Sequence, residues 1–197
     1  MAYRVLAINP GSTSTKIAIY EGETEAVRMT LKHSEAELSR FTTMADQHEY
    51  RETFVLKFLE ENNISLSSIN AVVGRGGLLN PLAGGTYKVN DEMCAFLKAA
   101  KRGEHASNLG AMIAKSIADR IDVPSFIVDP VVVDELSVDA RYAGHPLFER
   151  ISIFHALNQK AVARLCASRI GKRYEDCNFI VAHIGGGISI GAHSRGK

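Results

Sequence analysis

The stretch AINPGSTSTKIAIY, residues 7–20, constrains the fold most, because it sets a polar turn between two apolar runs. Residues 5–9 form a mostly apolar, β-prone run that is typical of a buried strand, and residues 17–20 form a second one. A Walker A loop is excluded, since it joins a strand to a helix and needs glycine directly before its lysine, whereas Thr15 precedes Lys16. The sequence therefore predicts a hairpin whose tip offers N–H groups, hydroxyls and one ammonium to phosphate oxygens. A polar turn without a ligand stays open as the alternative.

Strand and helix patterns alternate along the rest of the chain. Strands are expected at 25–33, 69–77, 84–89 and 125–129, and helices at 48–63, 90–100, 107–121 and 149–172. A last strand–turn–strand unit is expected at 178–197. An opening hairpin followed by alternating elements predicts an α/β protein, with a mixed sheet flanked by helices. We expect a first lobe at 1–147 and the beginning of a second lobe at 148–197, which the sequence leaves truncated.

Composition bounds the class of protein. The 197 residues are 46% hydrophobic and 23% charged, which is ordinary for a globular protein. A net charge of +1 gives no electrostatic reason to expect a nucleic-acid or membrane partner. No stretch is as long and apolar as a membrane span, and no leader pattern opens the chain, so a cytoplasmic location is predicted.

Cysteines and two histidines carry little signal for chemistry. The three cysteines show no metal spacing, and Cys94 and Cys166 lie in apolar helical stretches, which predicts buried thiols in a reducing compartment. His33 and His48 stand in polar surroundings, and we expect both to be solvated.

A second glycine-rich turn, HIGGG at 183–187, also follows an apolar strand. Gly185, Gly186 and Gly187 have no Cβ, so their N–H groups can approach a ligand closely. Either turn alone is weak evidence for a phosphate-binding site, because tight hairpins also use glycine where no ligand binds. Together the two turns predict that both bind one polyphosphate.

Four polar residues lie at the ends of expected elements. Arg75 is flanked by glycines and suits a bidentate grip on a carboxylate, although a surface-loop arginine fits equally well. Asp129 ends a strand, where α/β sites collect, but a turn aspartate is the commoner case. His105 precedes a helix and could be a cap, and His155 in SIFHAL could be a core residue.

Six motifs in this order carry a family resemblance: AINPGSTSTKIAIY, GRGGLLNPLAGGTYKVN, GEHASNLGA, VDPVVVDEL, HPLFERISIFHALNQKAVAR and AHIGGGISIGAH. They resemble the butyrate kinase branch of the acetokinase family, in the superfamily of acetate and sugar kinases, heat-shock proteins and actin. The resemblance runs over the whole chain and identifies it as an N-terminal portion. It implies actin-like (ribonuclease H-like) lobes that transfer the γ-phosphoryl group of ATP, with Mg²⁺, reversibly to butyrate or a related short or branched acid.

The resemblance also implies residue roles. Phosphate groups would be bound by Ser12, Ser14 and Lys16 in the first turn, and by His183, Gly185, Gly186 and Gly187 in the second. The carboxylate would be bound by Arg75, His105 and Asn108, and the metal would lie near Asn9 and Asp129. Catalysis would depend on Arg75, Asp129 and His155. The implied partners are ATP and a small carboxylate, and the full-length form would be a homo-oligomer.

Physical chemistry agrees with this reaction. A carboxylate nucleophile is already ionised near neutral pH, so the reaction needs no general base. The sequence accordingly shows no pattern that pairs a base with a nucleophilic side chain. Phosphoryl transfer depends mainly on positioning and cations. The family's adenosine-binding segment and second active-site arginine lie beyond Lys197, so this chain alone is predicted to be inactive. Two other classes stay open: a nucleotide-binding or partner-binding actin-like module without catalysis, and a plain α/β lobe.

Overall fold

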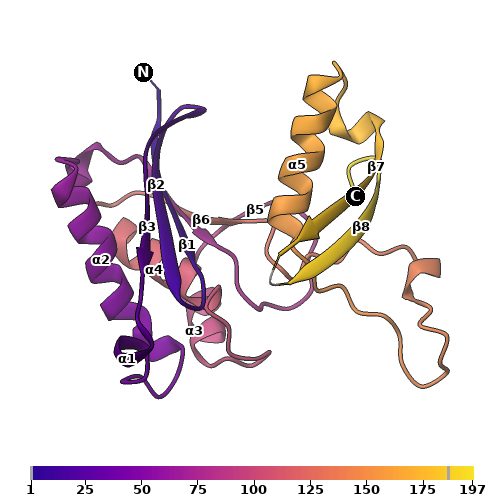
Figure 1. Ribbon diagram of the computed structural model, residues 1–197, viewed down its shortest axis with the longest axis horizontal. Helices are drawn as coiled ribbons and strands as arrows, with labels where there is room; N and C mark the ends of the chain where they lie inside the picture. The colour runs from indigo at the N-terminus through magenta and orange to yellow at the C-terminus, as the bar shows by residue number, and fades with distance from the viewer. Residues whose placement is uncertain (1, 186) are drawn as a thin grey trace. The chain divides into compact units, whose positions relative to one another are not determined.

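The computed structural model describes residues 2–185 and 187–197, so the predicted phosphate-binding Gly186 lies outside the described residues. Contacts divide the chain into two compact units (Figure 1). The first unit holds the residues up to Leu79 together with Thr86–Val128, and the second holds Asn80–Gly85 and Asp129–Lys197. The predicted boundary after residue 147 therefore falls inside the second unit, and the lobes of the whole protein stay a prediction.

A six-stranded mixed sheet forms the centre of the first unit, in the order β3-β2-β1-β4-β6-β5. Its strands are β1 (Arg4–Pro10), β2 (Ser14–Glu21), β3 (Thr24–Lys32), β4 (Ala71–Arg75), β5 (Thr86–Lys88) and β6 (Ser125–Val128). The predicted hairpin is confirmed, since β1 and β2 pair antiparallel with Leu6 opposite Ile19 and Ile8 opposite Ile17. Strands β1, β4 and β6 are parallel neighbours, so their carboxyl ends share one edge of the sheet.

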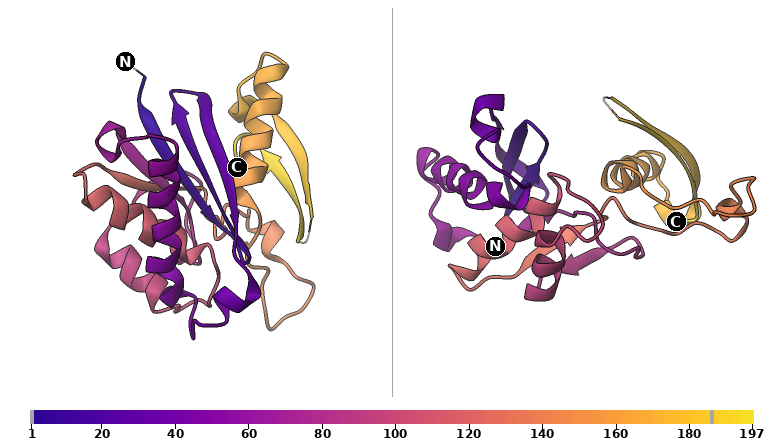
Figure 2. Two further views of the ribbon diagram at one scale, coloured as in Figure 1. Left: turned by 60° about the vertical axis from the view of Figure 1, so that its left-hand side comes forward. Right: turned by 90° about the horizontal axis from the view of Figure 1, so that it is seen from below.

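Helices α2 (His48–Glu61) and α4 (Asn108–Asp119) cover one face of this sheet (Figures 1 and 2). The alternation of β1 and β2 turns Leu6, Ile8, Ile17 and Ile19 toward that face. Two further helices, α1 (Glu35–Leu38) and α3 (Asp91–Lys98), complete the unit. Asn90 caps α3, because its Oδ1 accepts the Met93 N–H at 2.8 Å.

The second unit pairs one helix with one hairpin. Helix α5 (Ala156–Arg169) packs against β7 (Asn178–Ile184), which pairs antiparallel with β8 (Ile188–Ser194). Small residues make this contact possible: Ala163 and Ala167 of α5 lie against Tyr174, Cys177 and Val181. The second predicted hairpin is therefore confirmed. No helix in the described part of the chain is long and apolar enough to cross a membrane.

The helix predicted at 149–172 begins only at Ala156, so its first turns were predicted wrongly. Residues 152–154 instead run along the 131–133 segment, while the Arg150 N–H donates to the Arg141 oxygen at 2.7 Å. The Phe154 N–H donates to the Val131 oxygen at 3.1 Å, and the Ser152 hydroxyl donates to the Val133 oxygen at 2.7 Å. The β-branched Ile151 and Ile153 favour this non-helical course, because they lose side-chain freedom in a helix.

Two predictions of exposure were also wrong. His33 is 4% exposed, because its ring packs against aromatic side chains of α2. Its main-chain N–H donates to the Thr13 oxygen. Cys166, predicted to be buried, is exposed on α5. Cys94 is half-buried, and burial raises the pKa of its thiol to about 11, so the thiol stays protonated at neutral pH.

Candidate functional site

The tip of the β1–β2 hairpin presents the residues of the first predicted phosphate site. The Gly11 N–H donates to the Ser14 oxygen at 2.7 Å and closes the turn. Ser12 and Lys16 are exposed there, and Ser14 is half-buried. Asn9, also exposed, pairs across the ladder with Lys16. The hydroxyls, the amide and the ammonium thus gather at one end of the hairpin.

Arg51 of α2 lies behind this tip, and no sequence pattern singled it out. Its side chain is completely buried, and its guanidinium donates to the Gly11 and Ser12 oxygens at 2.7 and 3.0 Å. The neighbouring Thr15 hydroxyl lies 2.9 Å from His33 Nε2. Burial, followed by the positive charge of Arg51, lowers the pKa of His33, so the ring behind the tip is neutral near pH 7.

Arg75 is positioned by a close crossing of two main chains. A Cβ on Gly74 would lie 2.0 Å from the Gly110 oxygen, and a Cβ on Gly110 would lie 2.2 Å from the Arg75 oxygen. Only glycine allows β4 and α4 to approach so closely. Arg75 is the last residue of β4, and burial lowers the pKa of its guanidinium from the ordinary value without discharging it.

His105 lies close to Arg75 in this unit. The Ser107 N–H donates to His105 Nδ1 at 3.1 Å, so the neutral ring carries its proton on Nε2. Burial lowers the pKa of His105, and the charge of Arg75 lowers it further. The end of β4 therefore offers two donors of different kinds, a guanidinium and a neutral imidazole.

Asn108 has a structural role close to the end of β4. It is 4% exposed, its Oδ1 accepts the Leu78 N–H at 2.9 Å, and its Nδ2 donates to the Gly103 oxygen at 3.1 Å. The amide therefore ties the segment after Arg75 to the start of α4. A direct contact between Asn108 and a substrate stays a prediction.

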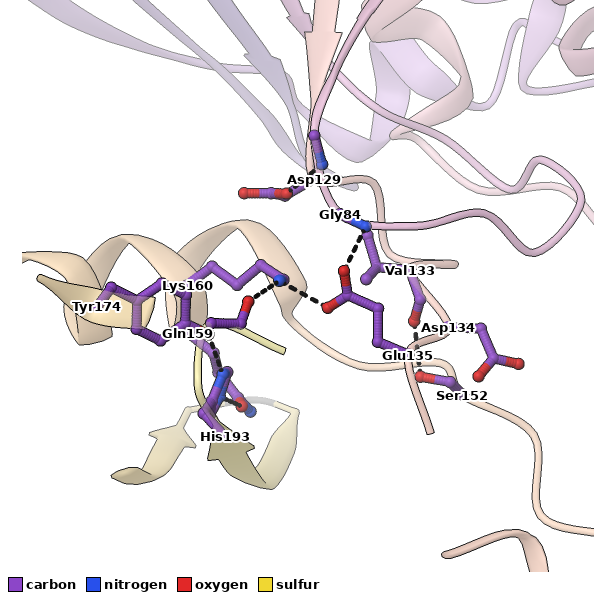
Figure 3. Close-up of polar contacts among 12 residues, drawn as sticks. Gly84, Asp129, Val133, Asp134, Glu135, Ser152, Gln159, Lys160, Tyr174 and His193 are labelled. Atoms are coloured by element: carbon purple, nitrogen blue, oxygen red, sulfur yellow. Dashed lines mark hydrogen bonds and ion pairs between the residues drawn. The ribbon is translucent and has the colours of Figure 1, made fainter. Parts of the chain in front are cut away.

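In the second unit, Asp129 is a buried and compensated carboxylate. It is 1% exposed, its Oδ1 accepts the Gly85 N–H at 2.8 Å, and its Oδ2 accepts from Arg164 at 3.0 Å. Its φ of 38° marks a turn in the left-handed region. Figure 3 shows Asp129 at the start of the segment that leads to Glu135.

His155 and His183 meet in the same unit. Their rings stack with centroids 3.7 Å apart and planes 7° apart. His155 Nδ1 lies 2.8 Å from the Ser189 hydroxyl, and His183 Nδ1 lies 2.9 Å from Asn158 Nδ2. A Cβ on Gly187 would lie 3.2 Å from the His155 ring, so the second glycine turn passes directly beside it. The structure thus brings together His155, His183 and Gly187, while Gly185 is exposed in the same turn.

A buried polar network, which sequence patterns did not reveal, reaches His155 through the Ser189 hydroxyl. Figure 3 shows its members Gln159, Lys160 and His193. Gln159 Nε2 donates to the Ser189 hydroxyl at 2.8 Å, and Gln159 Oε1 lies 3.0 Å from His193 Nε2. Lys160, the residue after Gln159, is 2% exposed and forms an ion pair of 2.7 Å with Glu135. Each unit therefore carries its own group of predicted site residues, and that both groups act on one ligand stays a prediction.

Comparisons with known proteins support the motif resemblance. No family model matches the sequence. Over all 197 residues, the chain is 55% identical to butyrate kinase 2 of Clostridium acetobutylicum and 54% identical to a probable butyrate kinase of Clostridium botulinum. The resemblance to the butyrate kinases is thereby confirmed. The chain spans about half the length of these curated relatives, covering 55% and 56% of them.

The fold also matches a solved structure. Acetate kinase of Porphyromonas gingivalis superposes with a TM-score of 0.70, although the sequences are only 18% identical. The match covers the whole of this chain and 56% of the acetate kinase. It confirms the predicted actin-like α/β fold.

Proposed function

We propose that the protein carrying this sequence is a carboxylate kinase that transfers the γ-phosphoryl group of ATP reversibly to butyrate, or to a related short or branched acid. The products are an acyl phosphate and ADP. The observation that supports this most is that His105, whose pKa is lowered by burial and then by the charge of Arg75, lies near that arginine in a chain 55% identical to a butyrate kinase. The proposal includes a cytoplasmic, homo-oligomeric whole protein.

The carboxylate is the nucleophile in this reaction. One of its oxygens forms a bond to the γ-phosphorus, and the bond from that phosphorus to the bridging oxygen of ADP breaks. The acid is ionised near neutral pH, so no proton is transferred. Arg75 binds the carboxylate through two N–H groups, and His105 Nε2–H is available as a further donor. Their role is to hold the nucleophile in line with the phosphorus.

Donors of the two glycine-rich turns are proposed to bind the ATP phosphates. In the transition state, negative charge spreads over three equatorial oxygens of the transferring group, so fixed donors accelerate the reaction. His155, stacked on His183, is proposed to donate to these oxygens. The phosphate-binding set consists of Ser12, Ser14, Lys16, His183, Gly185, Gly186 and Gly187.

Magnesium fits this site as an ion carried by the nucleotide. Among the described residues, no group of three or more carboxylate, histidine or cysteine side chains could hold a metal ion. Asp129 is already compensated by Arg164, and Asn9 offers one exposed amide. Mg²⁺ commonly keeps several waters and binds substrate phosphates with few protein ligands. When bound, the ion would offset the negative charge of the phosphates, while Asn9 and Asp129 are proposed to lie near it.

A hydroxamate assay with ATP, Mg²⁺ and a series of short linear and branched acids tests the proposal on the whole protein. Arg75→Ala should lower kcat/KM for butyrate by on the order of 10²-fold or more, because a buried charged contact to the reacting group is lost. Arg28→Ala is the matched control, since Arg28 is an exposed arginine of β3 that forms a long ion pair of 3.6 Å with Glu25. Normal kinetics in Arg75→Ala would contradict the assignment.

A non-catalytic nucleotide-binding or partner-binding module is the alternative class. It predicts ATP binding without acyl phosphate formation from any acid in the whole protein. A nucleotide-binding module that only switches conformation does not need a carboxylate-binding site, so the arrangement of Arg75 and His105 favours the kinase. The 197-residue chain alone is proposed to be inactive in the same assay.

A further inference from the structure

The guanidinium of Arg51 is enclosed by hydrogen-bond acceptors at the back of the β1–β2 hairpin tip. It comes from α2 and is completely buried. Each of its nitrogens has an acceptor. These acceptors are the main-chain oxygens of Gly11 (2.7 Å), Ser12 (3.0 Å) and Ser14 (3.2 Å), the Thr15 hydroxyl (3.2 Å) and Gln47 Oε1 (2.8 and 3.0 Å).

This burial is not explained by an ion pair. No carboxylate in the described part of the chain forms a salt bridge with Arg51, and burial lowers the pKa of its guanidinium. A buried charge without a counter-charge is costly unless something else compensates for it. The neutral acceptors satisfy its hydrogen bonds but leave its positive charge without an opposite charge. An anion bound at the tip would supply that opposite charge.

The direction of the carbonyl groups decides what the tip presents to its surroundings. In a trans peptide unit, the C=O and the following N–H point to opposite sides. The Gly11 and Ser12 oxygens turn toward Arg51, so the N–H groups of Ser12 and Thr13 turn away from it. Both residues are exposed, and neither N–H has a hydrogen-bond partner among the residues that the structure describes.

We propose that Arg51 is the positioning residue of an anion site made by the Ser12 and Thr13 N–H groups. Its hydrogen bonds hold two carbonyls inward, and its charge stands behind the two outward donors. Successive N–H groups that converge in this way bind phosphate oxygens. That the anion is a phosphate group of ATP rests on the proposed function. The orientation of the two N–H groups does not rest on it.

Amide NMR with inorganic pyrophosphate tests the site directly in the whole protein. Pyrophosphate should shift the Ser12 and Thr13 amide signals, while the Gly22 amide, in the turn at the other end of β2, should not move. Unchanged Ser12 and Thr13 signals at saturating pyrophosphate would overturn the inference even if the protein is an active kinase. Shifts in a protein that makes no acyl phosphate would refute the proposed function and leave this inference standing.

Variants then separate Arg51 from a purely structural residue. Arg51→Met should weaken pyrophosphate binding and raise KM for ATP, each by about tenfold, and leave KM for the carboxylate unchanged. Arg51→Lys keeps the charge and should recover part of the affinity. Lys57→Met is the matched control, because Lys57 is an exposed cation on the same helix and forms a long ion pair of 3.6 Å with Glu61.

Two results would overturn the role of Arg51: wild-type pyrophosphate affinity in folded Arg51→Met, or equal loss of ATP and carboxylate affinity. If Arg51→Met does not fold, Gln47→Leu provides the test, since it removes one acceptor that orients the guanidinium and keeps the arginine. Gln47→Leu should weaken pyrophosphate binding in the same direction, and an unchanged affinity in this variant would overturn the inference.

Discussion

Replacing Gly74 by alanine should open the crossing of β4 and α4. The new Cβ would lie 2.0 Å from the Gly110 oxygen and 2.3 Å from the Gly110 carbonyl carbon, whereas ordinary contact begins at 3.4 Å. The two main chains would therefore have to separate by about 1.4 Å, the difference between these two distances. Both elements are part of the core, because Val72 of β4 and Leu109 and Ile113 of α4 are completely buried. Separation therefore loosens the packing around them.

The magnitude follows from the atoms involved. Overpacking a well-packed core costs about 1–3 kcal/mol and occasionally more. The upper part of that range applies here, because the opposing atoms belong to the main chain and cannot rotate away. A loss of about 3 kcal/mol in the free energy of unfolding corresponds to a fall of roughly 6–12 °C in the unfolding midpoint for a chain of this size.

Thermal and urea unfolding followed by circular dichroism would measure this loss. Gly144→Ala is the control, because nothing lies within 4 Å of its added Cβ and only its φ of 81° opposes alanine. That strain should cost about 1–2 kcal/mol. Because Arg75 is the next residue, folded Gly74→Ala should also bind the carboxylate more weakly. A Gly74→Ala midpoint equal to that of the wild type would refute the inference that this crossing is closely packed.

Three further predictions concern buried polar groups. Asn108→Leu should lower the free energy of unfolding by about 2 kcal/mol in urea titrations, since the Leu78 N–H and the Gly103 oxygen lose their buried partner. Asn108→Asp should lose at least as much, because its second carboxylate oxygen would face the Gly103 oxygen. Lys160→Met should cost about 3 kcal/mol because it leaves the Glu135 carboxylate unpaired, and the added change Glu135→Leu should recover most of this if the charge is the cause. Burial lowers the pKa of His33, so the unfolded state binds its proton more readily and stability should fall as the pH drops below about 6.5. His33→Gln should flatten that dependence in urea titrations between pH 7 and pH 5, and an unchanged slope would contradict the assignment.

Local patterns were sufficient for many elements. The β1–β2 and β7–β8 hairpins combine apolar alternation with glycine-rich turns, and both are present where they were expected. The cap at Asn90 depends on a hydrogen bond to a residue three positions away. These features depend on neighbours in the sequence, so the sequence contains the information that specifies them.

Residues 149–155 show where local patterns fail. Their apolar spacing fits a helix, yet the Phe154 N–H bonds to the Val131 oxygen, which no local pattern anticipates. The exposure of Cys166 fails for a related reason, because only packing decides which side of a helix is covered. Intrinsic helix preference is a weak tendency that distant partners override.

The sequence by itself determined the family resemblance, the two glycine-rich turns and most candidate residues, including Arg75 and His105, because motifs and element ends are local. Tertiary structure alone decided how those residues are held. The stacking of His155 on His183 joins the residue before α5 to a residue of β7, and Arg51 reaches the Gly11 oxygen across 40 positions of sequence. A buried guanidinium is tolerated only where acceptors converge on it, and that convergence exists only once α2 has packed against the hairpin.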